Sequence, residues 1–228
     1  MKIKGWNSYE MTWLLLFITV GVYISVSGGE IKYFDLSVFI SGIFCVVLAA
    51  KGSIWTYIFG MYNSLGYAYM SYTNGLFGEM GLNLFFFMPT NIIGLMIWRK
   101  KMSENVVIMR ALSNKNKIIT GFLCVVGIVI TGFMLSLIKG QNSPYIDATT
   151  NTLLIIATLL MIWRYKEQWI LYIILNIFTI IMWSIRMANG SPEGPIMIVM
   201  WSSFLVNAMY GYYNWSKGAK KEAVREEI

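Results

Sequence analysis

The 228-residue sequence contains no histidine, only two cysteines and four prolines, and only 13% charged residues. Without histidine, and with Cys45 and Cys124 isolated in separate apolar runs, neither a His/Cys metal site nor a disulfide framework is expected. An enzyme acting within a membrane would need a nucleophile with a base, or a metal cluster. We therefore expect no catalytic residue, no cofactor and no metal, and we interpret both cysteines as buried, inert thiols.

Hydrophobic residues, by contrast, make up 57% of the chain, which indicates a polytopic membrane protein surrounded by lipid. The net charge of +7 would fit a nucleic-acid partner if the basic residues formed one surface. They fall instead in short runs between apolar segments, where they orient helices in a membrane. We expect no nucleic-acid partner.

The apolar segments predict eight transmembrane helices, since most approach the roughly 20 residues that cross a bilayer. The short second segment and the third, interrupted by tyrosine and glycine, have the weakest patterns. The first segment could also be a signal peptide, but the retained Met1 favours an uncleaved helix. A symmetric proline hinge is not expected, although Pro89 could bend the fourth helix alone. The segments are 11–27, 36–50, 54–72, 80–98, 118–138, 146–163, 168–187 and 195–215.

The basic residues also predict the topology. With a cytoplasmic N-terminus and eight spans, only Lys32, Lys139 and Arg186 lie outside, and the remaining fifteen lysines and arginines lie inside. Both termini are therefore expected in the cytoplasm. The loop 99–117 and the tail 217–228 would be solvated segments facing anionic lipid, without a further role.

Two three-span segments follow one plan, with corresponding positions 113 to 117 residues apart. In each, the middle span opens on a tryptophan, Trp55 or Trp169, and carries an asparagine seven or eight residues later. Since a single span separates the segments, both run in the same direction, as parallel repeats. The predicted all-α architecture is 3+1+3, with an extra N-terminal helix. Its parts are an extra helix 1–34, a first repeat 35–101, a loop and linking helix 102–144, a second repeat 145–216 and a tail 217–228.

Polar and aromatic residues recur at helical spacing within three of the spans. Amides donate and accept hydrogen bonds without charge, and aromatic faces stack on rings and attract cations. Such a lining favours a small neutral or cationic ligand with a ring and hydroxyl groups. It disfavours an anion because no lysine or arginine lies within a span, Arg186 being at an external edge. The candidate substrate-binding residues are Trp169, Tyr172, Asn176, Trp183, Asn83, Phe87, Asn91, Asn207, Gln168 and Asn63.

Each of these residues also has a purely structural interpretation. Asparagines in membrane helices often join helices by hydrogen bonds, and Trp98, Trp163 and Trp215 fit an interfacial tryptophan belt. Asn176 lies in mid-span between aromatic residues, which favours a binding role for it. Glu79 and Glu193 would be entrance charges or solvated loop charges, and Glu167 a helix-start charge.

The stretches "NGLFGEMGLNLFFFMPTNIIGLMIW" (74–98) and "RYKEQWILYIILN" (164–176) resemble the PnuC family of vitamin transporters, over roughly residues 35–215. The family shares the 3+1+3 plan with full-length SWEET transporters. Its members pair Glu-x-Trp-x-x-Trp with a following Asn. Here Glu167, Trp169 and Asn176 match, whereas Tyr172 replaces the second tryptophan.

The resemblance implies facilitated diffusion of nicotinamide riboside, a vitamin B3 and NAD precursor, by alternating access. A separate cytoplasmic kinase would trap the riboside. It also implies a homo-oligomer, with a homotrimer as the family expectation, in a bacterial inner membrane. Because Tyr172 departs from the family pattern, thiamine or riboflavin remain alternative substrates, and a receptor or structural membrane protein is a more distant alternative.

Overall fold

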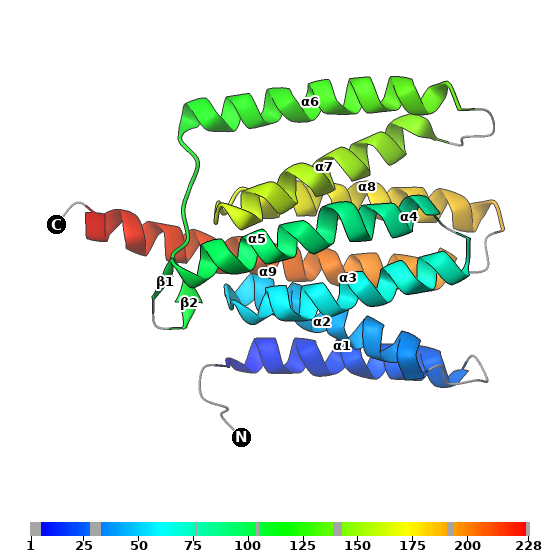
Figure 1. Ribbon diagram of the computed structural model, residues 1–228, viewed down its shortest axis with the longest axis horizontal. Helices are drawn as coiled ribbons and strands as arrows, with labels where there is room; N and C mark the ends of the chain where they lie inside the picture. The colour runs from blue at the N-terminus through cyan, green and yellow to red at the C-terminus, as the bar shows by residue number, and fades with distance from the viewer. Residues whose placement is uncertain are drawn as a thin grey trace. The chain divides into compact units, whose positions relative to one another are not determined.

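The computed structural model describes residues 6–27, 33–75, 77–103, 105–138, 143–190 and 194–226. Within these ranges the chain forms eight long helical segments and one short hairpin (Figure 1). It divides into two compact units, Met1–Val107 and Ile108–Ile228. The eight segments coincide with the eight apolar runs of the sequence, so the all-helical prediction is confirmed.

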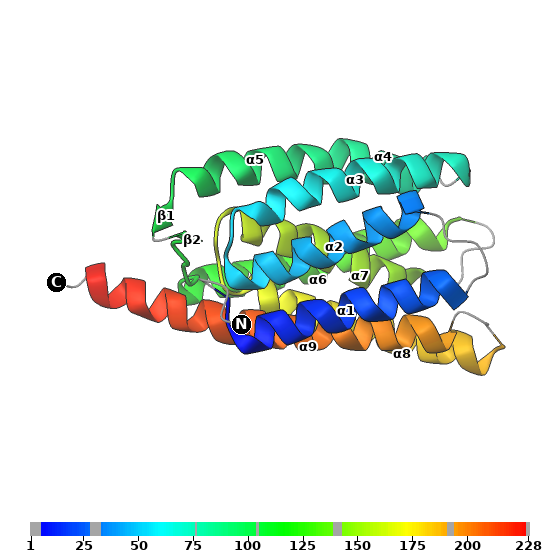
Figure 2. The same cartoon turned by 90° about the horizontal axis from the view of Figure 1, so that it is seen from below.

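The first unit is a series of helices in which each packs against the next (Figure 2). Helix α1 packs on α2, α2 on α3, and α3 on the last helical segment of the unit. That segment is one continuous run of α4, a π-helical turn and α5. The elements are α1 (Ser8–Ser27), α2 (Tyr33–Lys51), α3 (Trp55–Thr73), α4 (Phe77–Leu82), the π-turn Asn83–Phe87, α5 (Met88–Arg99), β1 (Met102–Ser103) and β2 (Val106–Val107).

The second unit has the same sequential packing, from α6 on α7 to α7 on α8 and α8 on α9. In Figure 1, α9 continues past the end of α8 and forms the C-terminal end of the chain. The helices are α6 (Asn114–Ser136), α7 (Pro144–Ile162), α8 (Gln168–Ala188) and α9 (Gly194–Glu226).

Five of the described helical segments are long and apolar enough to cross a membrane. They are Tyr33–Lys51, Phe77–Arg99, Asn114–Ser136, Pro144–Ile162 and Gln168–Ala188. Helix α3 is not among them, because the tyrosines and glycines that weakened its sequence pattern lower its mean hydropathy. It is nevertheless a regular helix of 19 residues.

The corners before α3 and α8 are built alike. Gly52 and Arg164 both have left-handed backbone angles, with φ of 77° and 67°. The residue after each donates its N–H to a carbonyl five residues back, Ser53 to Leu48 and Tyr165 to Leu160, both at 2.9 Å. This is the hydrogen bond of a Schellman C-cap, which ends a helix and turns the chain into the next one.

The helix that follows each corner is locked to its partner by an aromatic ring on a glycine. Tyr57 lies against Gly94 and meets Trp98 edge-on at 4.9 Å. In the second unit Trp169 lies against Gly211 and meets Trp215 edge-on at 6.1 Å. A glycine is needed at both places because a Cβ atom would overlap the ring.

This register corrects one sequence interpretation. Trp55 was matched with Trp169, but Trp55 is 59% exposed and the residue in the equivalent contact is Tyr57. Counted from the two corners, Gly52 and Arg164, Tyr57 and Trp169 occupy the same position. Matching one tryptophan to another by residue type shifted the comparison by two residues.

The predictions for the loop and the tail were wrong in part. The loop contains the antiparallel pair β1–β2 and buries Val107, Met109 and Leu112, because six of the seven residues 106–112 are apolar. The tail is helical as far as Glu226, since α9 continues through it without a break. Its alanines, lysines and glutamates are strong helix formers.

Helix α5 is preceded by a π-helical turn over Asn83–Phe87, six residues or fewer before Pro89. A proline removes one backbone N–H and crowds the preceding turn, and a wider turn accommodates it. The hydroxyl of Thr90 donates to the carbonyls of Phe86 at 2.8 Å and Phe87 at 3.0 Å. The irregularity beside Pro89 is therefore a π-helical turn.

We predict that Gly94→Ala destabilises the protein by about 1–3 kcal/mol, because the new methyl group overpacks the Tyr57 ring. Gly121→Ala in α6 is the matched control, since no atom lies within 4 Å of its Cβ position. It should leave stability unchanged or raise it by up to about 1 kcal/mol. Thermal unfolding in detergent measures both variants, and equal melting temperatures for the two would contradict the ring-on-glycine lock.

Candidate functional site

Helix α8 buries several polar residues and exposes a row of isoleucines. Gln168, Trp169, Asn176 and Thr179 are all at most 4% exposed. The exposed positions of the helix include Ile170, Ile174, Ile177, Ile181 and Ile185. This reversal of the pattern in soluble proteins is expected where the outer face meets lipid and polar groups turn inward.

Gln168 is the most unusual of these residues. It is 0% exposed, yet neither its Oε1 nor its Nε2 atom has a hydrogen-bond partner among the described residues. The Nε1 atom of Trp169 is in the same condition. A buried polar group without a partner costs about 1–3 kcal/mol, so each such group calls for an explanation, such as a bound ligand or water.

Trp169 and Tyr172 form an aromatic pair one turn apart on α8, with ring centroids 5.8 Å apart and planes at 54°. Trp169 is fixed from the α9 side by Gly211 and Trp215. The hydroxyl groups of Tyr172 and Thr158 lie 3.4 Å apart, which ties Tyr172 to α7. The two rings are therefore held by different neighbouring helices.

Asn176 lies one turn beyond Tyr172 and is 4% exposed. Trp183 is seven residues further along, about 10 Å at 1.5 Å per residue. The Arg186 guanidinium lies 4.9 Å from the centroid of the Trp183 ring. Trp183 thus has a charged partner near the end of the helix, whereas Gln168, Trp169, Tyr172 and Asn176 form a contiguous, uncharged series.

The asparagines of the first unit join helices. Asn63 donates from Nδ2 to the carbonyl of Val38 in α2 at 2.8 Å. Asn91 donates from Nδ2 to Oγ of Ser64 in α3 at 3.3 Å. The observed contacts of Asn63 and Asn91 therefore agree with the structural interpretation, in which asparagines join helices by hydrogen bonds.

The remaining candidate residues are distributed over other elements. Asn83 is buried and donates to the carbonyl of Glu79 at 2.8 Å, within its own helical segment. Phe87 is half-buried and packs on Phe86, with centroids 5.2 Å apart. Asn207 is buried in α9, one turn before Gly211. Among the candidates, the contiguous series on α8 therefore consists of four residues: Gln168, Trp169, Tyr172 and Asn176.

Glu167 anchors the loop that the sequence left without a role. Its buried Oε2 atom accepts a hydrogen bond from the backbone N–H of Leu112 at 3.0 Å. Lys117 Nζ lies 3.8 Å from Oε1. The side chain makes no capping hydrogen bond to α8, so its main contact is with the loop rather than with the helix start. The sequence offered one signal for this residue, its place in the family motif.

Arg164 extends the same anchor. Its NH1 atom donates to the carbonyl of Ile108 at 3.0 Å. The Arg110 N–H donates to the Arg164 carbonyl at 2.8 Å, and the Lys166 N–H donates to the Arg110 carbonyl at 2.9 Å. Burial and then the nearby Arg110 lower the pKa of Arg164, while Tyr165 and Glu222 raise it. Hydrogen bonds therefore hold residues 108–112 against residues 164–167, the corner directly before Gln168 and Trp169.

The fold and this site define a class: a helical membrane protein in which helix α8 buries a series of amides and aromatic rings. The model of the nicotinamide mononucleotide transporter family matches residues 32–217. The chain therefore belongs to the nicotinamide mononucleotide transporter family, and the resemblance to PnuC proteins seen in the sequence is confirmed.

Individual relatives match over nearly the whole chain. The nicotinamide riboside transporter PnuC of Haemophilus influenzae is 34% identical, over 96% of this chain and 94% of its own length. The protein of that name from Neisseria mucosa is 35% identical, over 96% and 85%. A crystal structure of the vitamin B3 transporter PnuC superposes with a TM-score of 0.78 at 34% identity, covering 96% of this chain and 95% of the other.

We predict that Glu167→Ala releases residues 108–112 and destabilises the protein by about 1.5–3 kcal/mol, the range for a hydrogen bond to a charged group. The release should appear as faster amide hydrogen exchange at Leu112 and faster trypsin cleavage after the exposed Arg110. Lys117→Ala is the control, since its 3.8 Å pair is partly exposed and worth at most about 1 kcal/mol. If both variants exchange at the wild-type rate, Glu167 does not hold the loop.

We also predict that Gln168→Met raises the melting temperature of the ligand-free protein, because it replaces a buried amide without partners by an apolar side chain of similar length. Gln168→Glu is the opposite change and should lower it, since an unpaired charge is still costlier to bury. A lower melting temperature for Gln168→Met would show that the amide is satisfied within the protein.

Proposed function

We propose that the chain transports nicotinamide riboside across a bacterial inner membrane by facilitated diffusion and alternating access, with both termini in the cytoplasm. The observation that carries the proposal is the uncharged series Gln168, Trp169, Tyr172 and Asn176, with buried polar atoms left open on the first two. Relatives named nicotinamide riboside transporters at about 35% identity support the choice of substrate. A separate cytoplasmic kinase would trap the riboside after release.

The chemistry of the riboside fits these residues group by group. Its carboxamide has one acceptor and two donors, which complement the donors and acceptor of the Gln168 amide. Its pyridinium ring is flat and positively charged, so it stacks on the indole face of Trp169 and gains a cation–π attraction. Its ribose hydroxyls can pair with the amide of Asn176. The carboxamide, the ring and the ribose thus each have an uncharged counterpart.

The mononucleotide, which the family name specifies, is a poorer fit to the same residues. It carries a phosphate group, which proteins bind with arginine, lysine or clustered backbone N–H groups. The described part of α8 has one basic residue, Arg186, and its guanidinium lies over Trp183 near the helix end. We therefore propose the riboside rather than the mononucleotide.

Thiamine is the second candidate, because it is also a cation with flat rings. The observation that favours it is Tyr172, whose hydroxyl lies 3.4 Å from the Thr158 hydroxyl where the family pattern has a second tryptophan. A hydroxyl adds a hydrogen-bonding group to the stacking surface. Riboflavin, with a larger fused ring, is the remaining alternative.

We further propose the 3+1+3 arrangement of parallel repeats, with α2–α5 and α7–α9 as the repeats, α6 as the linking helix and α1 as the extra one. The matched corners at Gly52 and Arg164 and the matched ring-on-glycine contacts support it. The corresponding ranges are 1–34, 35–101, 102–144, 145–216 and 217–228. A homo-oligomer, with three copies as the family expectation, is part of the same proposal.

The test is counterflow in liposomes, in which vesicles loaded with an unlabelled compound accumulate its labelled form. Labelled riboside should accumulate only in vesicles that contain both the protein and internal riboside. Nicotinamide mononucleotide, thiamine and riboflavin serve as competing internal loads. Counterflow of thiamine without the riboside would replace the substrate, and no counterflow of any compound would overturn the transporter proposal.

We predict that Asn176→Leu leaves the melting temperature near that of the wild type but weakens riboside binding by about tenfold, the loss expected for a hydrogen bond of about 1.4 kcal/mol. Asn63→Leu is the matched control, because Asn63 already bonds to Val38. It should lower the melting temperature and leave affinity unchanged in the folded fraction. Isothermal titration measures both, and retained affinity in Asn176→Leu would return Asn176 to a purely structural role.

A further inference from the structure

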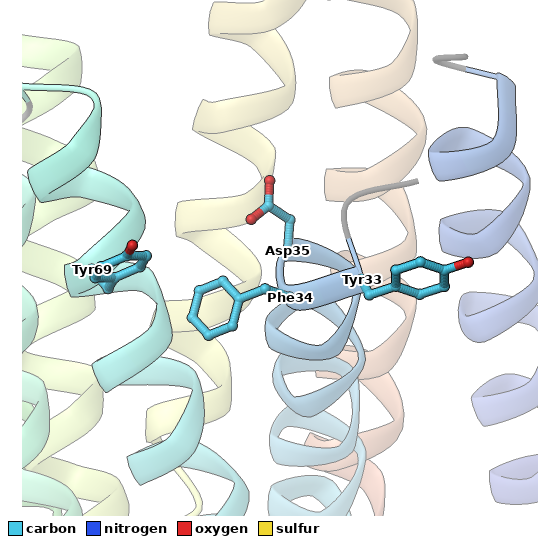
Figure 3. Close-up of a pocket in the computed structure, with 4 residues that line it drawn as sticks. All are labelled: Tyr33, Phe34, Asp35 and Tyr69. Atoms are coloured by element: carbon cyan, nitrogen blue, oxygen red, sulfur yellow. The ribbon is translucent and has the colours of Figure 1, made fainter. Parts of the chain in front are cut away.

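A second aromatic site lies in the first unit, away from the residues of α8. Tyr33, Phe34 and Asp35 at the start of α2 and Tyr69 near the end of α3 line an open hollow of about 610 Å³. Figure 3 shows the Phe34 ring turned toward Tyr69, the Asp35 carboxylate projecting from α2 higher in the view, and the Tyr33 ring on the other side of α2. The Phe34 and Tyr69 rings meet edge-on with centroids 5.4 Å apart.

The hollow has a fixed frame. Ser37, one turn below Phe34, donates from Oγ to the Phe34 carbonyl at 2.7 Å. The same Oγ lies 2.7 Å from the Tyr62 hydroxyl of α3. These bonds tie the first turn of α2 to α3 beneath the rings. The positions of the rings therefore do not depend on a ligand to assemble them.

The charges of this end of the unit favour a cation. Asp35 is half-buried beside the rings, and Glu79 lies in the first turn of α4, close to where α3 ends. The lysines and arginines among the described residues of this unit are Lys51, Arg99, Lys100 and Lys101, at the opposite helix ends or beyond. In one hollow, a carboxylate attracts a positively charged ring by Coulomb forces and the aromatic rings attract it by cation–π forces.

We propose that this hollow is an outer binding site that collects a cationic, ring-containing ligand before it is transported. The inference rests on the proposed function, which makes this end of α2 and α3 the external one and supplies a ligand with a pyridinium ring. Asp35 provides the charge, and Phe34 and Tyr69 provide the faces. An interfacial belt of aromatic residues would also place rings at this depth, but it would not require the carboxylate.

The test is the initial rate of uptake by intact cells that have no other riboside transporter, since external addition fixes the side of entry. Asp35→Asn should raise the half-saturating riboside concentration about threefold at low ionic strength and leave the maximal rate unchanged. The difference should shrink as salt is added, because screening weakens the attraction of a partly exposed charge. Asp35→Glu, which keeps the charge, is the matched control.

The reduced riboside supplies a second arm, because its dihydropyridine ring has the same outline and no charge. Asp35→Asn should leave its uptake unchanged. Lys32 lies outside the described residues, three positions before Asp35 in the sequence, so the comparison is repeated with Lys32→Ala and the effect of Asp35→Asn should persist. An equal effect on both ribosides, or none on the cationic one at low salt, overturns the outer site. No uptake by the wild type would instead overturn the proposed function.

Discussion

Within each unit, the packing of the helices depends on one contact, an aromatic ring that lies against a helical glycine. In hydrocarbon, helices gain little from burying apolar side chains against one another, so close packing and hydrogen bonds must hold them together. Tyr57 on Gly94 and Trp169 on Gly211 supply that packing, each with a tryptophan one turn further along the partner helix. In the second unit, the ring that lies against the glycine is Trp169, which is also part of the candidate site. The contact that orders α8 against α9 therefore fixes the orientation of Trp169.

The candidate site depends on a contrast between two uses of amides in the same protein. The side-chain amides of Asn63 and Asn91 donate hydrogen bonds to neighbouring helices. Gln168 is fully buried, and neither of its side-chain polar atoms has a hydrogen-bond partner among the described residues. Selection for stability alone would favour an apolar residue at that position, since an unpaired buried amide costs free energy. Our proposal that a ligand pairs with this amide accounts for a polar residue at so buried a position.

The sequence predicted the helices well because their patterns are local. Apolar length identified the eight segments, whereas the π-turn before Pro89 was not predicted. Contacts between distant residues were not predictable in this way. Asn63 and Asn176 look alike in sequence, and only the Val38 carbonyl shows that Asn63 is a structural residue. The docking of Leu112 on Glu167 and the match of Tyr57, rather than Trp55, with Trp169 likewise depend on tertiary geometry.

The central claim is that the substrate forms hydrogen bonds with the buried polar atoms of Gln168 and Trp169 that have no partner among the described residues. A structure of the protein with nicotinamide riboside bound tests it most directly. The account predicts the riboside carboxamide within about 3 Å of the Gln168 amide, with the pyridinium ring stacked on Trp169. A riboside bound elsewhere, with the Gln168 amide hydrogen-bonded only to protein, would contradict it.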